Sequence, residues 1–113
     1  MHSILDGNTL DRLTKFKAYP AGWYGRDIGE ALSIDTVMLF EEFAKSLGTL
    51  HTSPSLFLTI DGHLQLAWED INDNGFEITV YSDKFEYYFE SDNSEGFFDE
   101  VDMQLLINKI KEC

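Results

Sequence analysis

The hydrophobic pattern from residue 55 onward constrains the fold more than any other feature of the sequence. From Ser55 on, the pattern has the period of two that is typical of a β-strand, with Leu56 and Leu58 on one side and Phe57 and Thr59 on the other. The dipeptide Asp61-Gly62 interrupts the alternation and is typical of a hairpin turn. A tight turn with Gly62 in the left-handed conformation pairs Leu58 with Leu64 and keeps the apolar side chains of both strands on one face.

A second pair of alternating segments, residues 76–81 and 85–90, predicts another hairpin with its turn at Ser82-Asp83. This register pairs Ile78 with Tyr87, so that one set of side chains from both strands points to the core. The expected core set is Phe76, Ile78, Val80, Phe85, Tyr87 and Phe89. The sequence therefore predicts four strands joined by short links, which is an antiparallel meander.

Helical periodicity flanks the strands. Asn8 is suited to cap a helix over residues 9–17, and Ser33 to cap a second over residues 34–47. After a polar loop, a last helix is expected from residue 99 or 100 to about residue 112. The prediction is one α+β domain over residues 1–113 with element order ααββββα. Two N-terminal helices and one C-terminal helix cover one face of a four-stranded sheet, and the other face meets solvent.

Negative charge is concentrated in the β-rich part of the chain. Residues 69–102 contain twelve acidic residues and one basic residue, Lys84, which gives a local charge of −11 out of −13 for the chain. Like charge gathered on one surface destabilises the folded state through self-repulsion. A small protein that keeps such a surface is expected to use it, and a positively charged partner is the matching chemistry.

Composition excludes several classes of function. A pI near 4.3 argues against direct binding of nucleic acid or of an anionic membrane, since both need basic patches. No apolar run is long enough to span a bilayer, and the N-terminal residues lack the pattern of a signal peptide. The chain has one cysteine, Cys113, which cannot form an internal disulfide. These features predict a cytoplasmic protein.

The predicted register places a group of acidic and aromatic side chains on the outward face. The third strand presents Glu77 and Tyr81, and the fourth presents Glu86, Tyr88 and Glu90. Glu77 is then directly opposite Tyr88, with the other two glutamates on its diagonals and no lysine expected on the face. Flanking loops are expected to extend this partner-binding set at one end of the sheet through Asp70, Asp73, Asp92 and Glu95.

The segment 70–75 has the spacing of the first half of a calcium-binding EF-hand loop. The second half is missing, because the position of the bidentate glutamate is occupied by Tyr81, and strand patterns flank the segment. We interpret it as a polar turn that uses Asn and Gly for positive φ, and we expect no metal. No other cofactor is indicated by the sequence.

The irregular segment 18–32 is a second candidate binding surface. It contains Trp23, Tyr24 and Arg26, residue types that are frequent at binding hot spots. The alternative is structural: Trp23 folds back over the core and Arg26 pairs with a nearby acid such as Asp27 or Glu30.

No nucleophile or acid–base pattern indicates an enzyme. The leading hypothesis is a non-enzymatic inhibitor that blocks a basic protein, such as a nuclease, a toxin or a CRISPR-type effector, by nucleic-acid mimicry. In size, acidity and lack of catalytic residues the chain is similar to toxin-immunity proteins and phage anti-defence (anti-CRISPR) inhibitors, although no family motif is present. One alternative is an interaction or assembly module that works through the open sheet face or an edge strand, with a homodimer as one form of it, and Phe57 on the outward side of the first strand fits this alternative. A second alternative is a small hydrolase or metal-dependent enzyme.

Overall fold

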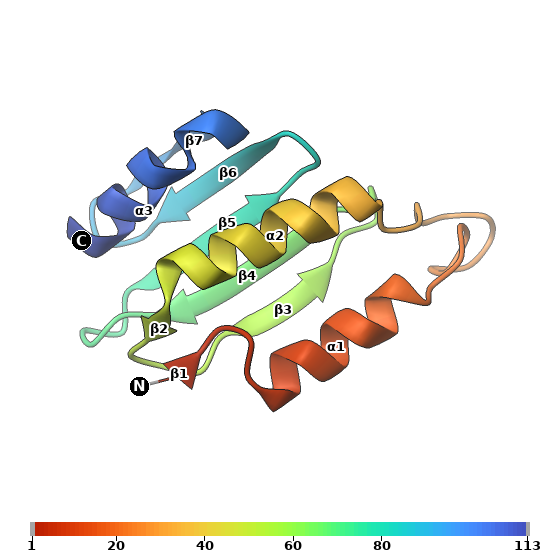
Figure 1. Cartoon of the computed structure of the whole chain (residues 1–113), viewed down its shortest axis with the longest axis horizontal. Coiled ribbons are helices and arrows are strands. Elements are labelled where there is room, and N and C mark those ends of the chain that lie inside the picture. The colour runs from red at the N-terminus through yellow and green to blue at the C-terminus, as the bar shows by residue number, and fades with distance from the viewer. Residues whose placement is uncertain (1, 113) are drawn as a thin grey trace.

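The structure is a computed structural model that describes residues 2–112. Its elements combine three α-helices with a small and a large β-sheet (Figure 1). In chain order they are β1 (His2–Ser3), α1 (Gly7–Lys17), α2 (Ile34–Leu47), β2 (Thr49–Leu50), β3 (Ser55–Leu58), β4 (Leu64–Glu69), β5 (Gly75–Val80), β6 (Lys84–Phe89), β7 (Ser94–Asp99), a 3-10 turn (Glu100–Asp102) and α3 (Met103–Glu112). The α+β class expected from the sequence is confirmed.

The large sheet is an antiparallel meander with strand order β3-β4-β5-β6-β7. Both hairpin registers expected from the sequence are present, since Leu58 pairs with Leu64 and Ile78 pairs with Tyr87. Gly62 has φ +80, as the first turn requires. The short β1–β2 pair at the N-terminal side was not expected.

The prediction of four strands is wrong by one, because residues 94–99 form β7 and are not a polar loop. The sequence of β7 lacks the alternation of apolar and polar residues that is typical of a strand. Gly96 lies in its middle, and Phe97 and Phe98 are adjacent. Gly96 leaves room for the Tyr87 side chain of β6, because an added Cβ would lie 3.0–3.2 Å from the hydroxyl end of that side chain, which would have to shift.

The three helices cover one face of the large sheet (Figure 1). Helix α1 lies beside β3, α2 crosses β4 and β5, and α3 packs on β7. The core lies between these layers and includes every expected inward side chain of β5 and β6 except Tyr87, which is half-buried at the edge of the core. The fully buried aromatic side chains are Phe40, Phe43, Phe85 and Phe89. The opposite face carries none of this core.

Side-chain caps set where the first two helices begin. Ser33 accepts a hydrogen bond from the Thr36 amide at 3.2 Å, as expected for the start of α2. Helix α1 begins at residue 7, and its cap is Asp6, which accepts from the Thr9 amide at 2.9 Å. The expected cap, Asn8, therefore lies inside the first turn. The last helix begins with a 3-10 turn that follows Asp99, whose side chain makes no capping hydrogen bond, and α3 proper comes after this turn.

Candidate protein-binding face

The register of the five strands arranges the outward side chains in rows that run across the sheet. One row consists of Ala67, Glu77, Tyr88 and Glu95, which are paired directly across β4, β5, β6 and β7. Directly opposite side chains in such rows have Cβ atoms about 4.5–5.5 Å apart. The expected pairing of Glu77 with Tyr88 is confirmed, and the unexpected strand β7 adds a second carboxylate on the other side of the tyrosine.

The neighbouring rows bring the other expected side chains onto the same face. Glu86 is paired with Thr79 and with Phe97 in one adjacent row. Glu90 follows β6 at the other side, where its amide donates to the Gly75 carbonyl at 2.9 Å. We call the side chains of Glu77, Glu86, Glu90, Glu95 and Tyr88 the acidic face.

The carboxylates of the acidic face differ in how far the protein itself satisfies them. Glu86 accepts a hydrogen bond from the Tyr81 hydroxyl at 2.9 Å, and Glu90 accepts from the Gly75 amide at 3.1 Å. Within residues 2–112, neither Glu77 nor Glu95 has a side-chain hydrogen bond or an ion pair. These two exposed carboxylates on either side of Tyr88 are therefore the ones available to a ligand.

The acidic face is slightly hollowed. A shallow depression of about 360 Å³ is lined by Glu77, Glu86, Tyr88 and Glu95, together with polar side chains of β4 and β5. A second depression of about 370 Å³ adjoins it at Glu77, where the neighbouring outward side chains, such as Ala67, are small. Both depressions are open, so they are suited to a protruding side chain of a partner rather than to an enclosed small molecule.

Tyr81 and Lys84 form a cluster at one end of the face. The Lys84 Nζ lies 4.9 Å from the centroid of the Tyr81 ring and 5.1 Å from that of Phe97, both within cation–π range. The expectation of a face without lysine is therefore wrong, and the period-two spacing of Lys84 with Glu86 would have revealed it. Partial burial raises the pKa of the Tyr81 hydroxyl, and its hydrogen bond to Glu86 adds to the rise.

Asp70 and Asp73 lie in the β4–β5 turn at the end of the sheet where the β6–β7 turn also lies. Asp70 accepts from the Asn74 amide at 3.0 Å and the Asn72 amide at 2.8 Å, and the bond from Asn74 is the chief reason why the pKa of Asp70 is lowered. Positive φ occurs at Asp73, not at Asn or Gly as expected. The turn is polar, and its first carboxylate is directed at its own backbone.

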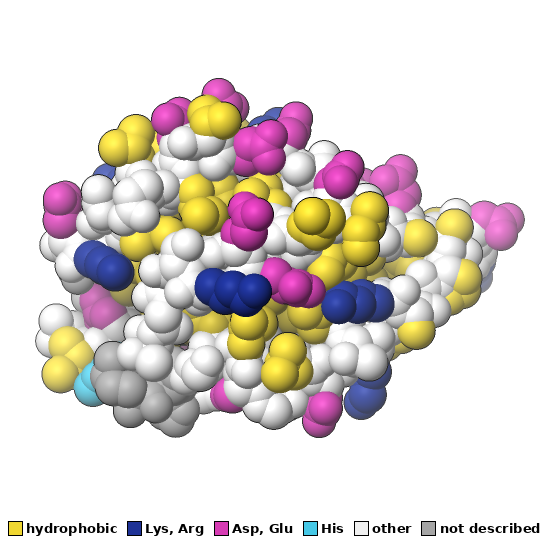
Figure 2. Space-filling view, in the orientation of Figure 1, with side chains coloured by type: hydrophobic (Ala, Val, Ile, Leu, Met, Phe, Trp, Pro, Cys, Tyr) yellow, Lys and Arg dark blue, Asp and Glu magenta, His cyan; other side chains and the backbone are white. Residues whose placement is uncertain are grey.

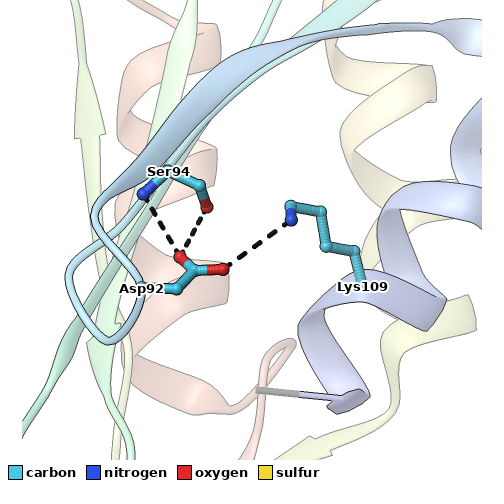
Figure 3. Close-up of polar contacts among 3 residues, drawn as sticks. All are labelled: Asp92, Ser94 and Lys109. Carbon is cyan, nitrogen blue, oxygen red and sulfur yellow. Dashed lines mark hydrogen bonds and ion pairs between the residues drawn. The ribbon is translucent and has the colours of Figure 1, made fainter.

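Asp92 does not lie free at the end of the acidic face. Figure 3 shows that its carboxylate is held between Ser94 and Lys109 of α3. It accepts from the Ser94 hydroxyl at 2.6 Å, which lowers the pKa of Asp92, and its other oxygen is 3.8 Å from the Lys109 Nζ. Asp92 therefore ties the β6–β7 turn to the helical layer. Glu95, expected in this loop, lies within β7 instead.

Most of the basic residues belong to the helices. On the helical side, Lys and Arg side chains lie among Asp and Glu side chains (Figure 2). An ion pair between Lys17 and Glu41 at 3.5 Å belongs to this mixed surface. Six of the eight basic residues are in helices, namely Arg12, Lys15, Lys17, Lys45, Lys109 and Lys111. The acidic face is consequently not balanced by neighbouring bases apart from Lys84.

The second candidate surface, residues 18–32, extends away from the sheet as an arm (Figure 1). Trp23 donates from its ring nitrogen to the Glu30 carbonyl at 2.8 Å and packs against Gly29, so it folds onto the arm itself and is not part of the core cluster. Tyr24 is 62% exposed. Arg26 adopts φ +53 at the tip and has no ion pair among the described residues. Both structural alternatives expected for Trp23 and Arg26 are therefore wrong.

The described residues contain neither a metal-binding cluster nor a membrane-spanning helix. Among residues 2–112, no group of three or more His, Cys, Asp or Glu side chains is arranged to hold a metal ion. No helix in this range combines the length and apolar character needed to cross a bilayer. In comparisons with protein-family models, curated proteins and solved structures, the chain matches none of them.

Proposed function

We propose that this chain is a non-enzymatic inhibitor that binds a basic protein through its acidic face. The observation that carries the proposal is the row Glu77–Tyr88–Glu95, in which two carboxylates without internal partners flank an aromatic ring over an open depression. A carboxylate without an internal partner is common on a protein surface. Two such carboxylates, one on each side of a tyrosine ring, form an arrangement that matches the geometry of one particular side chain.

That side chain is arginine. The flat face of a guanidinium group stacks on an aromatic ring, and its edge donates paired hydrogen bonds to carboxylates. An arginine inserted beside Tyr88 would meet Glu77 on one side and Glu95 on the other. The depression of about 360 Å³ gives room for the guanidinium and part of its aliphatic stem.

The class of partner follows from the charge. Proteins that handle nucleic acids carry basic clefts because they bind phosphates. With a net charge of −13, of which −11 falls in residues 69–102, this chain would be steered toward such a cleft and would occupy it in place of the nucleic acid. Nucleases, toxins that cleave nucleic acid and CRISPR-type effectors are the proposed targets, and the chain would act as an immunity or anti-defence protein in the cytoplasm.

The test removes the two free carboxylates without changing side-chain shape. The double variant Glu77→Gln/Glu95→Gln is compared with wild type for capture of proteins from the source cells, followed by calorimetry with the captured basic protein. Because a hydrogen bond to a charged group contributes about 1.5–3 kcal/mol, the double variant should bind at least about a hundredfold more weakly.

A matched control separates this contact from the loss of net charge. The double variant Asp35→Asn/Glu42→Gln changes the charge by the same amount, but on α2 in the helical layer. It should retain binding within about threefold, since only long-range steering is reduced. Equal loss of affinity in the two double variants, or no loss in either, would contradict the proposal.

A further inference from the structure

The two edges of the large sheet are treated differently by the rest of the chain. At β3, helix α1 lies alongside, and the Arg12 Nε donates a hydrogen bond of 2.7 Å to the Leu56 carbonyl, one of the backbone groups directed away from the sheet. At β7, no turn, loop or side-chain hydrogen bond within residues 2–112 reaches the backbone of Glu95 or Phe97. One edge is thus partly covered and the other is open.

The alternation of hydrogen bonds in the sheet shows which backbone amides and carbonyls of β7 are not bonded to β6. The Tyr81 amide donates to the Lys84 carbonyl, and the Glu90 amide donates to that of Gly75, so the even-numbered residues of β6 bond to β5. Antiparallel ladders alternate, and the odd-numbered residues of β6 therefore bond to the even-numbered residues of β7. The amides and carbonyls of Glu95 and Phe97 must then point away from the sheet.

The open edge lacks the backbone features, a proline or a bulge, that often protect one. Residues 94–99 contain no proline and no lysine, and the ladder to β6 continues without interruption over the whole strand. Phe97 is 58% exposed, and Glu95 and Asp99 are exposed on the same outward face. An edge of this kind can accept an additional strand, whose backbone would satisfy the open groups.

Charge determines which strand fits. A second copy of this chain would bring two proteins of net charge −13 together, and a pairing centred on Phe97 would set Glu95 directly against Asp99. Like charges directly opposite one another destabilise a strand pair. An extended segment with basic side chains would instead meet a carboxylate at each end of the edge and Phe97 between them.

We propose that the edge of β7 receives an extended basic segment of the partner as a sixth, antiparallel strand. This inference rests on the proposed function and specifies how the partner is held. The segment should carry Lys or Arg opposite Glu95 and Asp99, with an apolar side chain opposite Phe97. Since alternate residues share a face, the required pattern is basic-x-apolar-x-basic. The basic side chain opposite Glu95 would lie at the margin of the depression beside Tyr88.

The probe for the test is a short synthetic peptide that carries Lys-Thr-Phe-Thr-Lys between neutral ends. Binding is followed by amide chemical shifts, and those of Glu95 and Phe97 should move most. In Phe97→Pro the outward amide is removed without touching the ladder to β6, so affinity should fall about tenfold, the equivalent of one lost hydrogen bond. Phe97→Ala keeps the amide and should lose less.

Peptides methylated on one amide test the same contact without changing the protein. Methylation at the lysine or phenylalanine positions blocks amides that face β7 and should weaken binding about tenfold, whereas methylation at the threonines between them should not. The proposed strand would be overturned if methylation at the lysine and phenylalanine positions weakened binding no more than methylation at the threonines. It would also be overturned if only methylation at the threonines weakened binding, or if the chain dimerised through β7. If Glu77→Gln/Glu95→Gln loses the native partner while the methylated peptides all bind alike, the proposed function stands and the edge contact fails.

Discussion

At the scale of single residues, Gly96 shows how one missing side chain lets β7 join the sheet. The Tyr87 side chain packs so close to Gly96 that a Cβ added there would lie 3.0 Å from its hydroxyl oxygen. Aromatic rings often pack over a glycine on the neighbouring strand, where they replace the contacts that the glycine cannot make. Because glycine is rare in strands, the same residue also made β7 hard to predict from the sequence.

We predict that Gly96→Ala destabilises the protein by about 1–3 kcal/mol, the usual cost of forcing extra volume into a packed site. The measurement is urea unfolding followed by circular dichroism. Gly75→Ala is the matched control, because Gly75 is also in a strand of the same sheet but has open space within 4 Å of an added Cβ. The control should change stability by less than about 0.5 kcal/mol. Similar losses in both variants would show that strand glycines, and not the Tyr87 contact, determine the effect.

Alternation alone was sufficient to place most of the candidate site. It predicted that Glu77 and Tyr88 lie opposite each other, because side-chain direction in a strand depends only on parity once the turn is known. The same parity places Lys84 on the face with Glu86. The partners of Asp92 were not predictable, since the contact with Lys109 joins a turn to a helix across a gap in sequence that no local pattern spans.

At the scale of elements, Arg12 links α1 to the edge of the sheet. Its guanidinium group lies 5.3 Å from the Phe16 ring of its own helix and 5.6 Å from the Phe57 ring of β3, while its Nε donates to the Leu56 carbonyl. One side chain therefore satisfies an edge carbonyl and covers an exposed aromatic ring. The contact also weakens the assembly hypothesis, because the Phe57 ring that fits such an interface is already covered in part by Arg12.

We expect Arg12→Ala to destabilise the protein by about 1.5–3 kcal/mol, through loss of a hydrogen bond to a charged donor, and to increase aggregation by uncovering the β3 edge. Thermal unfolding and light scattering measure the two effects. Lys15→Ala, which removes an exposed base from the same helix, should leave both nearly unchanged. Wild-type behaviour of Arg12→Ala would mean that α1 alone protects the edge.

Elements with regular patterns were predicted well and those with local exceptions were not. The bounds of α2 match the expected residues 34–47, since Ser33 and Gly48 mark both ends with residues of strong positional preference. Helix α1 begins earlier than expected because Asp6 caps it in place of Asn8, and both residue types are good caps. Sequence preference could not choose between two such neighbours.

At the scale of the whole molecule, charge is separated between the two sides of the sheet. The helical side mixes both signs, whereas the acidic face has a single base nearby, Lys84, whose Nζ lies over two aromatic rings. Repulsion among the outward carboxylates opposes folding, and salt reduces it by shortening the distance over which charges interact.

Raising the salt concentration from 0.01 M to 0.1 M shortens that distance from about 30 Å to about 10 Å, so we predict that the chain becomes more stable. A gain of about 1 kcal/mol would raise the midpoint of thermal unfolding by about 4–8 °C for a domain near this size. Glu77→Gln/Glu95→Gln should respond less to salt than wild type does, as measured by calorimetry. A midpoint that falls on adding salt would show that attractive pairs outweigh the repulsion.

The division of the sheet into a covered and an open side has an evolutionary consequence. The core is built from alternate residues of β5 and β6, and the residues between them do not belong to it. Substitutions at those outward positions can therefore change the surface while the packing of the core stays the same. During evolution, the side chains of the acidic face could therefore be replaced one at a time while the inward side chains stayed the same.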